Sequence, residues 1–333
     1  MIEFKDVTKR YPDGTVAVDN LSLRIPSHQI TVFVGPSGCG KTTSLRMINR
    51  TIERSSGTIS IDDEDINSQD AVQLRRGIGY VIQHAGLFPH KTVLDNVATV
   101  PKLLGWDKAK TRSTALELLE RVGLDLKLAD RYPAQLSGGQ QQRVGVARAL
   151  AADPKILLMD EPFSAVDPIV RNQLQEELLR LQRDIGKTMV FVTHDIDEAI
   201  KLGDNVAVLR VGGKLAQFAP PAELLANPVD EFVESFIGKD RGYRALTFVT
   251  ADTLRLTDVP GELARAEDGT PKGWANGSGE LEPVGATFQR GDSLRAALDA
   301  VLTSPVGKGV CVDEAGKVVG VVEYAALAEA IRA

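Results

Sequence analysis

The chain has 333 residues, of which 43% are hydrophobic and 25% charged, with a net charge of −6 and two cysteines. This composition is that of an ordinary globular protein that can fold without disulfides or metals, in about two or three units. It argues against a general nucleic-acid binder, the cysteine count favours an intracellular protein, and the charged N-terminus is unlike a signal peptide.

Apolar patterns predict alternating strands and helices over the first two thirds of the chain. Period-two alternation or short β-branched runs predict strands at residues 1–10, 21–25, 30–34, 77–83, 155–159 and 189–193. Helical periodicity predicts helices at residues 42–49, 107–122, 137–151 and 168–185. Strands that alternate with helices indicate an α/β fold whose sheet contains parallel strands.

The composition changes after Gly238. Residues 269–279 are rich in Gly, Pro, Asn and Ser, which predicts a loop or linker. A helix follows at residues 292–302, with Asp292 or Ser293 as its N-cap. With strands at 283–288, 309–312 and 317–322 and a helix at 324–331, the tail is predicted to be a small α+β unit in the order β-α-β-β-α.

Residues 35–42 have the spacing of a phosphate-binding loop. Its glycines let the backbone close around an anion, Lys41 can reach the terminal phosphates, and the Thr42 hydroxyl can ligate Mg²⁺. A turn that matches by chance is disfavoured, because this loop follows a buried strand and opens a helix. The candidate phosphate-binding residues are Gly35, Pro36, Ser37, Gly38, Cys39, Gly40, Lys41, Thr42 and Thr43.

An acidic pair, Asp160-Glu161, ends the strand predicted at residues 155–159. An Asp in this position can hold Mg²⁺ through its water shell. The neighbouring Glu can act as a general base on an attacking water. On these residues alone, a solvated acidic pair is an equal alternative.

Residues 136–140 have the sequence Leu-Ser-Gly-Gly-Gln and lie at the start of the helix predicted at 137–151. After the phosphate loop, this is the second helix N-terminus in the chain that is suited to an anion. A bare Ser-Gly-Gly is also a flexible helix entry. The run continues through Gln141-Gln142-Arg143 into the acidic strand, and here the sequence resembles the ATP-binding cassette (ABC) family. The resemblance covers residues 1–238.

This resemblance implies an ATPase that binds ATP and Mg²⁺, with a mixed-sheet core, an antiparallel β-subdomain and an α-helical signature subdomain. Two copies would sandwich two ATP molecules head to tail, so the signature of one copy faces the phosphate loop of the other. The residues implied to act in trans are Ser137, Gly138, Gly139, Gln140 and Asp167. Val166 stands where the family usually has Leu.

Further roles follow from the same resemblance. Tyr11 matches the aromatic residue that stacks on adenine, and Gln83 would ligate Mg²⁺ with Thr42 and Asp160. Glu161 would be the general base, and His194 the switch residue that contacts the γ-phosphate. Without the family, Tyr11 would be an ordinary surface aromatic, Gln83 a polar residue at a strand end, and His194 a structural histidine.

Residues 83–90 resemble the segment at which importers dock a membrane permease subunit, although the same residues are compatible with small-domain core. A finer resemblance, to importers of quaternary amines and osmoprotectants (glycine betaine, carnitine, choline, proline), rests on residues 47–50, 86–90 and 193–204. It implies a motor at the cytoplasmic face of the membrane, with a solute-binding protein as an indirect partner. Membrane contact would come through partners, since no apolar run reaches the roughly 18 residues of a spanning helix. The alternatives are an importer of another solute and a soluble ABC ATPase without a transport role.

The tail, residues 292–333, resembles one CBS-type regulatory module. The expected domains are therefore a nucleotide-binding domain at 1–238, an irregular linker or degenerate module at 239–283, and a CBS-like module at 284–333. In the family such tails sense ionic strength or bind adenine-type nucleotides. A dimerisation module without a ligand is the alternative.

Overall fold

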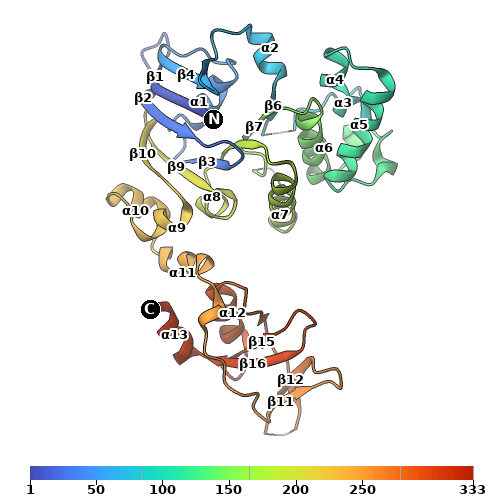
Figure 1. Ribbon diagram of the computed structural model, residues 1–333, viewed down its shortest axis with the longest axis vertical. Helices are drawn as coiled ribbons and strands as arrows, with labels where there is room; N and C mark the ends of the chain where they lie inside the picture. The colour runs from blue at the N-terminus through green and yellow to red at the C-terminus, as the bar shows by residue number, and fades with distance from the viewer. Residues whose placement is uncertain (84, 165, 278, 333) are drawn as a thin grey trace. The chain divides into compact units, whose positions relative to one another are not determined.

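The computed structural model describes residues 1–83, 85–164, 166–277 and 279–332. The chain divides into two units, Met1–Leu224 with Pro228–Phe236, and Leu225–Asn227 with Ile237–Ala333. Figure 1 shows their helices and strands, with labels where there is room.

Two sheets form the centre of the first unit. The larger contains β3 (Ile30–Val34), β6 (Ile78–Val81), β7 (Ile156–Asp160), β8 (Thr188–Val192), β9 (Asn205–Arg210) and β10 (Lys214–Ala219). Its order is β10-β9-β3-β8-β7-β6, and all neighbours are parallel except the pair β9–β10. The smaller sheet is antiparallel, in the order β2-β1-β4-β5, and contains β1 (Ile2–Arg10), β2 (Val16–Ile25), β4 (Ser56–Ile61) and β5 (Glu64–Asp65).

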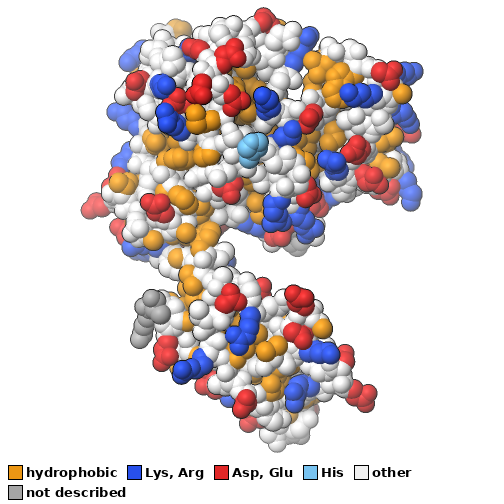
Figure 2. Space-filling view, in the orientation of Figure 1, with side chains coloured by type: hydrophobic (Ala, Val, Ile, Leu, Met, Phe, Trp, Pro, Cys, Tyr) orange, Lys and Arg blue, Asp and Glu red, His pale blue; other side chains and the backbone are white. Residues whose placement is uncertain are grey.

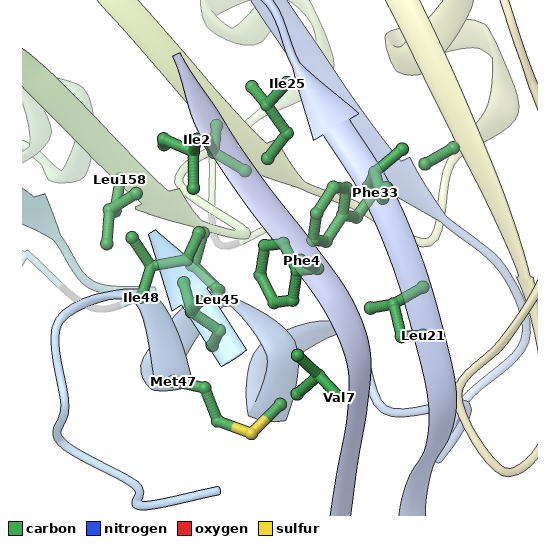
Figure 3. Packing of buried hydrophobic residues seen from close by; sticks show 14 of the residues in the cluster. Ile2, Phe4, Val7, Leu21, Ile25, Phe33, Leu45, Met47, Ile48 and Leu158 are labelled. Atoms are coloured by element: carbon green, nitrogen blue, oxygen red, sulfur yellow. The ribbon is translucent and has the colours of Figure 1, made fainter. Parts of the chain in front are cut away.

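Helix α1 (Lys41–Ile48) packs in a hydrophobic core that both sheets share. Phe4 of β1 meets Phe33 of β3 edge-on, with ring centroids 6.5 Å apart, and Leu45 and Ile48 of α1 lie in the same cluster (Figure 3). Burying a side chain of this size stabilises the fold by about 1.5–3 kcal/mol. The helix that follows the phosphate loop is therefore held on a rigid base.

Helices α3 to α6 form a lobe of the first unit beside the sheets in Figure 1. Their bounds are α3 (Val93–Val97), α4 (Thr99–Leu103), α5 (Lys108–Arg121) and α6 (Gly138–Leu150), with 3-10 turns at Leu126–Leu128 and Pro133–Gln135. Helix α5 begins after Asp107, whose carboxylate accepts hydrogen bonds from two backbone N–H groups, and ends before Gly123 with φ 70°. The other described helices that lie wholly or mostly in the first unit are α2 (Ala71–Arg76), α7 (Pro168–Ile185), α8 (Ile196–Leu202), α9 (Pro221–Ala226) and α10 (Glu231–Ile237). Together with the two sheets, this lobe confirms the predicted α/β fold.

The second unit contains the predicted β-α-β-β-α succession. Its members are β14 (Thr287–Phe288), α12 (Leu294–Thr303), β15 (Lys308–Val312), β16 (Val318–Glu323) and α13 (Tyr324–Arg332). The strands pair in the order β14-β15-β16, and β14 is shorter than the predicted strand at 283–288. Helix α11 (Arg241–Ala245) and 3-10 turns at Leu246–Phe248 and Ala251–Thr253 come before them.

The predicted loop at residues 269–279 is wrong over part of its length, because β12 (Pro271–Ala275) runs through it. This strand lies between β11 (Leu263–Arg265) and β13 (Leu281–Glu282) in an antiparallel sheet. Trp274 of β12 is 1% exposed and packs with Val310 and Val321 of the neighbouring sheet. A Cβ on Gly273 would stand 2.6 Å from the backbone O of Glu282, so this glycine permits close strand pairing.

Charges of both signs are mixed on the surface. Figure 2 shows acidic and basic side chains interspersed over the drawn face of each unit. Among the described helices, none combines the length and hydropathy needed to span a bilayer.

Candidate functional site

A cavity of about 660 Å³ lies over the phosphate loop, within the size range of small-molecule sites. It is lined by Ala17, Gly35, Pro36, Ser37, Gly38, Cys39, Gly40, Lys41, Thr42, Thr43, Glu161, His194 and Phe236. The fold thus brings the candidate phosphate-binding residues together with the candidate base and the switch histidine. Ala17 and Phe236 carry no sequence motif, so only the fold identifies them as lining residues.

The loop presents backbone donors at the start of α1. Gly40 is the N-cap residue, with φ 92°, and a Cβ there would stand 2.2 Å from the backbone O of Ala17. The first turn of α1 has neither a side-chain cap nor an acidic residue, so its N–H groups are available to an anion. Lys41 Nζ donates to the carbonyls of Gly35 and Pro36, at 2.7 and 3.0 Å. This arrangement suits the binding of phosphate groups.

Asp160 ends β7 beside Thr42, whose hydroxyl donates to Asp160 Oδ1 at 2.8 Å. The other carboxylate oxygen accepts from Tyr80 Oη and Arg46 Nη2, each at 3.3 Å. Burial raises the pKa of the Tyr80 hydroxyl, so it remains a donor. A hydroxyl and a carboxylate are hard oxygen ligands, and these two residues fit a Mg²⁺ ion. The sequence motifs missed Tyr80 and Arg46, which only the fold places around this carboxylate.

Glu161 has a left-handed backbone, with φ 46°, which is uncommon for this residue type and is found at strained functional positions. Its Oε2 lies 3.3 Å from His194 Nδ1 and accepts from Gln83 Nε2 at 3.4 Å. These three residues follow β7, β8 and β6, whose parallel order brings their carboxyl ends to one edge of the sheet. The carboxylate is thereby held between an imidazole and an amide.

Tyr11 is not among the described residues that line the cavity. It follows β1 and is half-buried, and Lys9 Nζ lies 5.0 Å from the centroid of its ring. Its role in adenine stacking stays a prediction.

The signature residues begin α6, and they too are outside the set that lines the cavity in the described part of the chain. Ser137 Oγ accepts from the Gln140 backbone N–H at 3.3 Å, and Gln140 Oε1 accepts from the Ser137 N–H at 2.9 Å, which makes a capping box. Gly138 has open space around it, whereas a Cβ on Gly139 would stand 2.9 Å from Val170 Cγ1 of α7. Gly139 therefore allows α6 and α7 to approach closely.

His84, in the segment at residues 83–90 that resembles a docking site, lies outside the described residues. Ala165, two positions before Asp167, also lies outside them. Asp167 comes directly before α7, and its carbonyl accepts from the Arg171 N–H at 2.8 Å.

Comparison with known proteins supplies the family. The chain matches the ABC transporter family over residues 18–164. The carnitine transport ATP-binding protein OpuCA of Listeria monocytogenes is 54% identical over 250 residues, and the match covers 75% of this chain and 63% of that protein. The glycine betaine uptake system ATP-binding protein YehX of Escherichia coli is 47% identical over 272 residues, with 81% and 88% covered.

A solved structure is also similar. It is a dimeric ATP-binding cassette in a post-hydrolysis state bound to ADP and Pi, with a TM-score of 0.60 and 36% identity over 66% of this chain and 99% of that one. The chain spans 63% of the length of OpuCA but 88% of YehX. From the identity and coverage of YehX, together with the assembled site, we conclude that this chain belongs to the family of ABC transporter ATP-binding proteins.

Proposed function

We propose that the chain hydrolyses ATP as the motor subunit of an ABC importer for quaternary-amine solutes of the glycine betaine, choline, carnitine and proline class. The observation that carries the catalytic part is the contact of Glu161 with His194 and Gln83 at the edge of the phosphate-loop cavity. The solute class is favoured by the transport functions for which OpuCA and YehX are named. Import of another small solute and a soluble role without transport are the alternatives.

Binding of ATP would use the loop and the start of α1. Their N–H groups and Lys41 Nζ would compensate the phosphate charges. Thr42, Gln83 and Asp160 would hold Mg²⁺, which when bound neutralises charge on the phosphoryl oxygens. The hydrogen bonds from Arg46 and Tyr80 keep the Asp160 carboxylate oriented toward Thr42.

Hydrolysis would use Glu161 as the general base. Its carboxylate accepts the proton of the attacking water, while His194 and Gln83 restrict where that carboxylate lies. His194 would also contact the γ-phosphate. Lys41 would offset the charge that develops on the phosphoryl oxygens as the bond to the leaving ADP breaks.

Replacing Glu161 tests this assignment. Glu161→Gln is expected to keep ATP affinity within about threefold and to lower turnover at least about 100-fold, because the amide cannot accept the proton. ATPase assays of the complex with its membrane partners, beside nucleotide-binding titrations, measure both. Glu120→Gln, which changes an exposed carboxyl on α5, is the control. Normal turnover in Glu161→Gln would remove the residue from the role of base.

A second copy of the chain would complete each site. Ser137, Gly138, Gly139 and Gln140, with Asp167 of the copy, would then face the ATP held on residues 35–43. The exposure of Ser137 and Gly138 at the start of α6 supports contact in trans. On this proposal Glu161→Gln should dimerise when ATP is added, as size-exclusion chromatography with light scattering would detect.

Residues 83–90 are proposed as the docking site of a permease helix. Phe88 is 39% exposed, and the buried Asn96 side chain bonds both its N–H, at 2.8 Å, and its carbonyl, at 3.1 Å. Arg148 of α6 donates to the carbonyls of Ala85 and Gly86, at 2.6 and 2.7 Å. An exposed aromatic ring is thus fixed to the helix that carries the signature, which would connect nucleotide binding to the membrane subunit.

The subunit would then lie at the cytoplasmic face of the membrane, held by its permease partners, with the solute-binding protein acting only through them. Co-purification with a membrane permease separates this proposal from a soluble ATPase. Uptake assays with a panel of radiolabelled amines identify the solute. Transport of an unrelated solute alone would retain the motor and exclude the substrate class.

The tail is proposed as a CBS-like regulatory module at residues 284–333, after a nucleotide-binding domain at 1–238 and a linker or degenerate module at 239–283. The β-α-β-β-α succession supports it. Deleting residues 244–333 tests whether it is a sensor. An unchanged response of transport to salt and nucleotides would exclude sensing and favour the dimerisation role.

A further inference from the structure

A buried polar cluster joins α7, the end of β8 and α8 behind the candidate site. Gln175, Thr193 and Glu198 are 5%, 2% and 7% exposed. Glu198 Oε1 accepts from Gln175 Nε2 at 3.1 Å, and Glu198 Oε2 accepts from Thr193 Oγ1 at 2.6 Å. A buried carboxyl group needs such partners, because desolvation without them is strongly unfavourable. We call these three residues the buried junction.

The buried junction fixes the backbone on both sides of His194. The Thr193 hydroxyl donates to Glu198 and accepts from the backbone N–H of Asp195 at 3.0 Å. The Asp195 carboxylate in turn accepts from the N–H groups of Asp197, at 2.8 Å, and Glu198, at 3.4 Å, at the start of α8. His194 itself is exposed, so its place is set by these neighbours rather than by packing of its own ring.

The buried junction also reaches toward the loop that ends at Asp167. Gln175 lies one helical turn from Arg171 on α7. Arg171 Nη2 donates to the carbonyl of Val166 at 3.2 Å. Its positive charge lowers the pKa of the Glu198 carboxyl, against the larger effect of burial. Burial raises the pKa of the Glu198 carboxyl, which agrees with its enclosed position. The His194 segment and the start of α7 therefore share one polar contact region.

We propose that the buried junction of Gln175, Glu198 and Thr193 positions His194 for ATP hydrolysis, so that Thr193 and Glu198 are positioning residues of the site. The inference rests on the proposed function, because hydrolysis is the step that it affects. Removing the Thr193 hydroxyl leaves a Glu198 oxygen and the Asp195 N–H without their partner. The segment that carries His194 then samples more conformations, which lowers the fraction of molecules with the histidine in place.

Thr193→Val removes the hydroxyl at nearly constant volume, and Thr193→Ser retains it. Thr193→Val is expected to lower kcat about tenfold with KM for ATP changed less than about twofold, and Thr193→Ser to stay within about threefold of wild type. Gln175→Met, which removes the other donor, should lower kcat in the same direction. Thr31→Val is the matched control, because Thr31 is fully buried in β3, the strand beside β8, and its hydroxyl has no hydrogen-bond partner among the described residues.

Two further measurements separate positioning from general damage. Amide hydrogen exchange in residues 193–198 should be faster in Thr193→Val than in Thr31→Val. In a His194→Ala background, Thr193→Val should lower kcat less than about twofold further, because the residue acts through the histidine. A full additional tenfold loss there, or wild-type kcat and exchange in Thr193→Val, would overturn the proposal. A wild-type protein without ATP turnover overturns the proposed function instead, and the exchange comparison still decides whether the buried junction holds this segment.

Discussion

Individual glycines of the phosphate loop are required for different physical reasons. Gly38 has φ 75° and open space around it, so only its backbone conformation favours glycine. Gly35 and Gly40 have no room for a side chain, since a Cβ would stand 2.3 Å from Leu209 O and 2.2 Å from Ala17 O. The phosphate loop therefore packs against the backbone of β2 and β9. Its conformation depends on these contacts as well as on the positive φ angles that glycine allows.

A comparison of Gly40→Ala with Gly14→Ala separates crowding from backbone conformation. Gly14 has a similar φ of 87°, and apart from its chain neighbours no described residue has an atom within 4 Å of its Cβ position. We expect Gly14→Ala to destabilise the protein by about 1 kcal/mol from its backbone alone. Gly40→Ala should lower the free energy of unfolding by more than about 3 kcal/mol and abolish ATP binding, because backbone atoms must move. Chemical denaturation measures the free energy of unfolding of the two variants, and nucleotide titration measures their ATP binding. Equal losses of stability in the two variants would contradict the crowding argument.

At the scale of elements, helix ends show where local sequence determines structure. Ser293 caps α12, and its Oγ accepts from the Ala296 N–H at 3.3 Å. Asp292, the other candidate for this cap, instead accepts from the Gln289 N–H at 2.7 Å. At the opposite end of α12, Ser304 is 8% exposed, and in the described part of the chain its hydroxyl has no hydrogen-bond partner.

These two serines provide a matched pair of substitutions. Ser293→Ala should destabilise the second unit by about 1 kcal/mol, because it removes the cap. Ser304→Ala should change stability by less than about 0.5 kcal/mol or increase it, since the buried hydroxyl it removes makes no hydrogen bond to any residue that the structure describes. Thermal unfolding of the two variants checks the difference. A larger loss in Ser304→Ala than in Ser293→Ala would show that the cap is not what stabilises α12.

At the scale of the whole molecule, each unit has a hydrophobic core of its own. The residues that line the phosphate-loop cavity belong to the first unit, and Trp274 belongs to a core of the second. A change in one core should therefore leave the other unit folded. Trp274 and Trp106 are the two tryptophans of the chain, so fluorescence can follow the units separately.

Trp274→Ala should destabilise the second unit by about 3–5 kcal/mol, because it removes one of the largest fully buried side chains. ATP affinity should stay within about twofold. Calorimetry should show an early transition for the tail, while Trp106 fluorescence reports the first unit unchanged. Loss of ATP binding in Trp274→Ala would mean that the two units depend on each other for folding.

Several elements could be predicted from sequence because their signals are local. β3 and the phosphate loop have a continuous apolar run followed by a fixed spacing, and α7 has the bounds that its periodicity predicts. β12 was missed because its glycine and proline content is typical of loops, and because Trp274 is buried by Val310 and Val321 of β15 and β16, which lie much later in the chain. The short β4 and β5 and the edge strand β10 have no strong pattern of their own, and pairing with neighbours defines them.

The candidate site divides in the same way. The sequence by itself determined the phosphate loop, because its fixed spacing follows a buried strand and opens a helix. It placed Asp160-Glu161 at a strand end and Ser137 at a helix start, which are equally local features, but the capping box of Ser137 and Gln140 came from the structure. Only the tertiary structure decided that Gln83, Glu161 and His194 meet, since this follows from the order β8-β7-β6 in the sheet. The same holds for the partners of Asp160 and for the buried junction. Strand order is set by packing over the whole core, and spacing along the chain does not encode it.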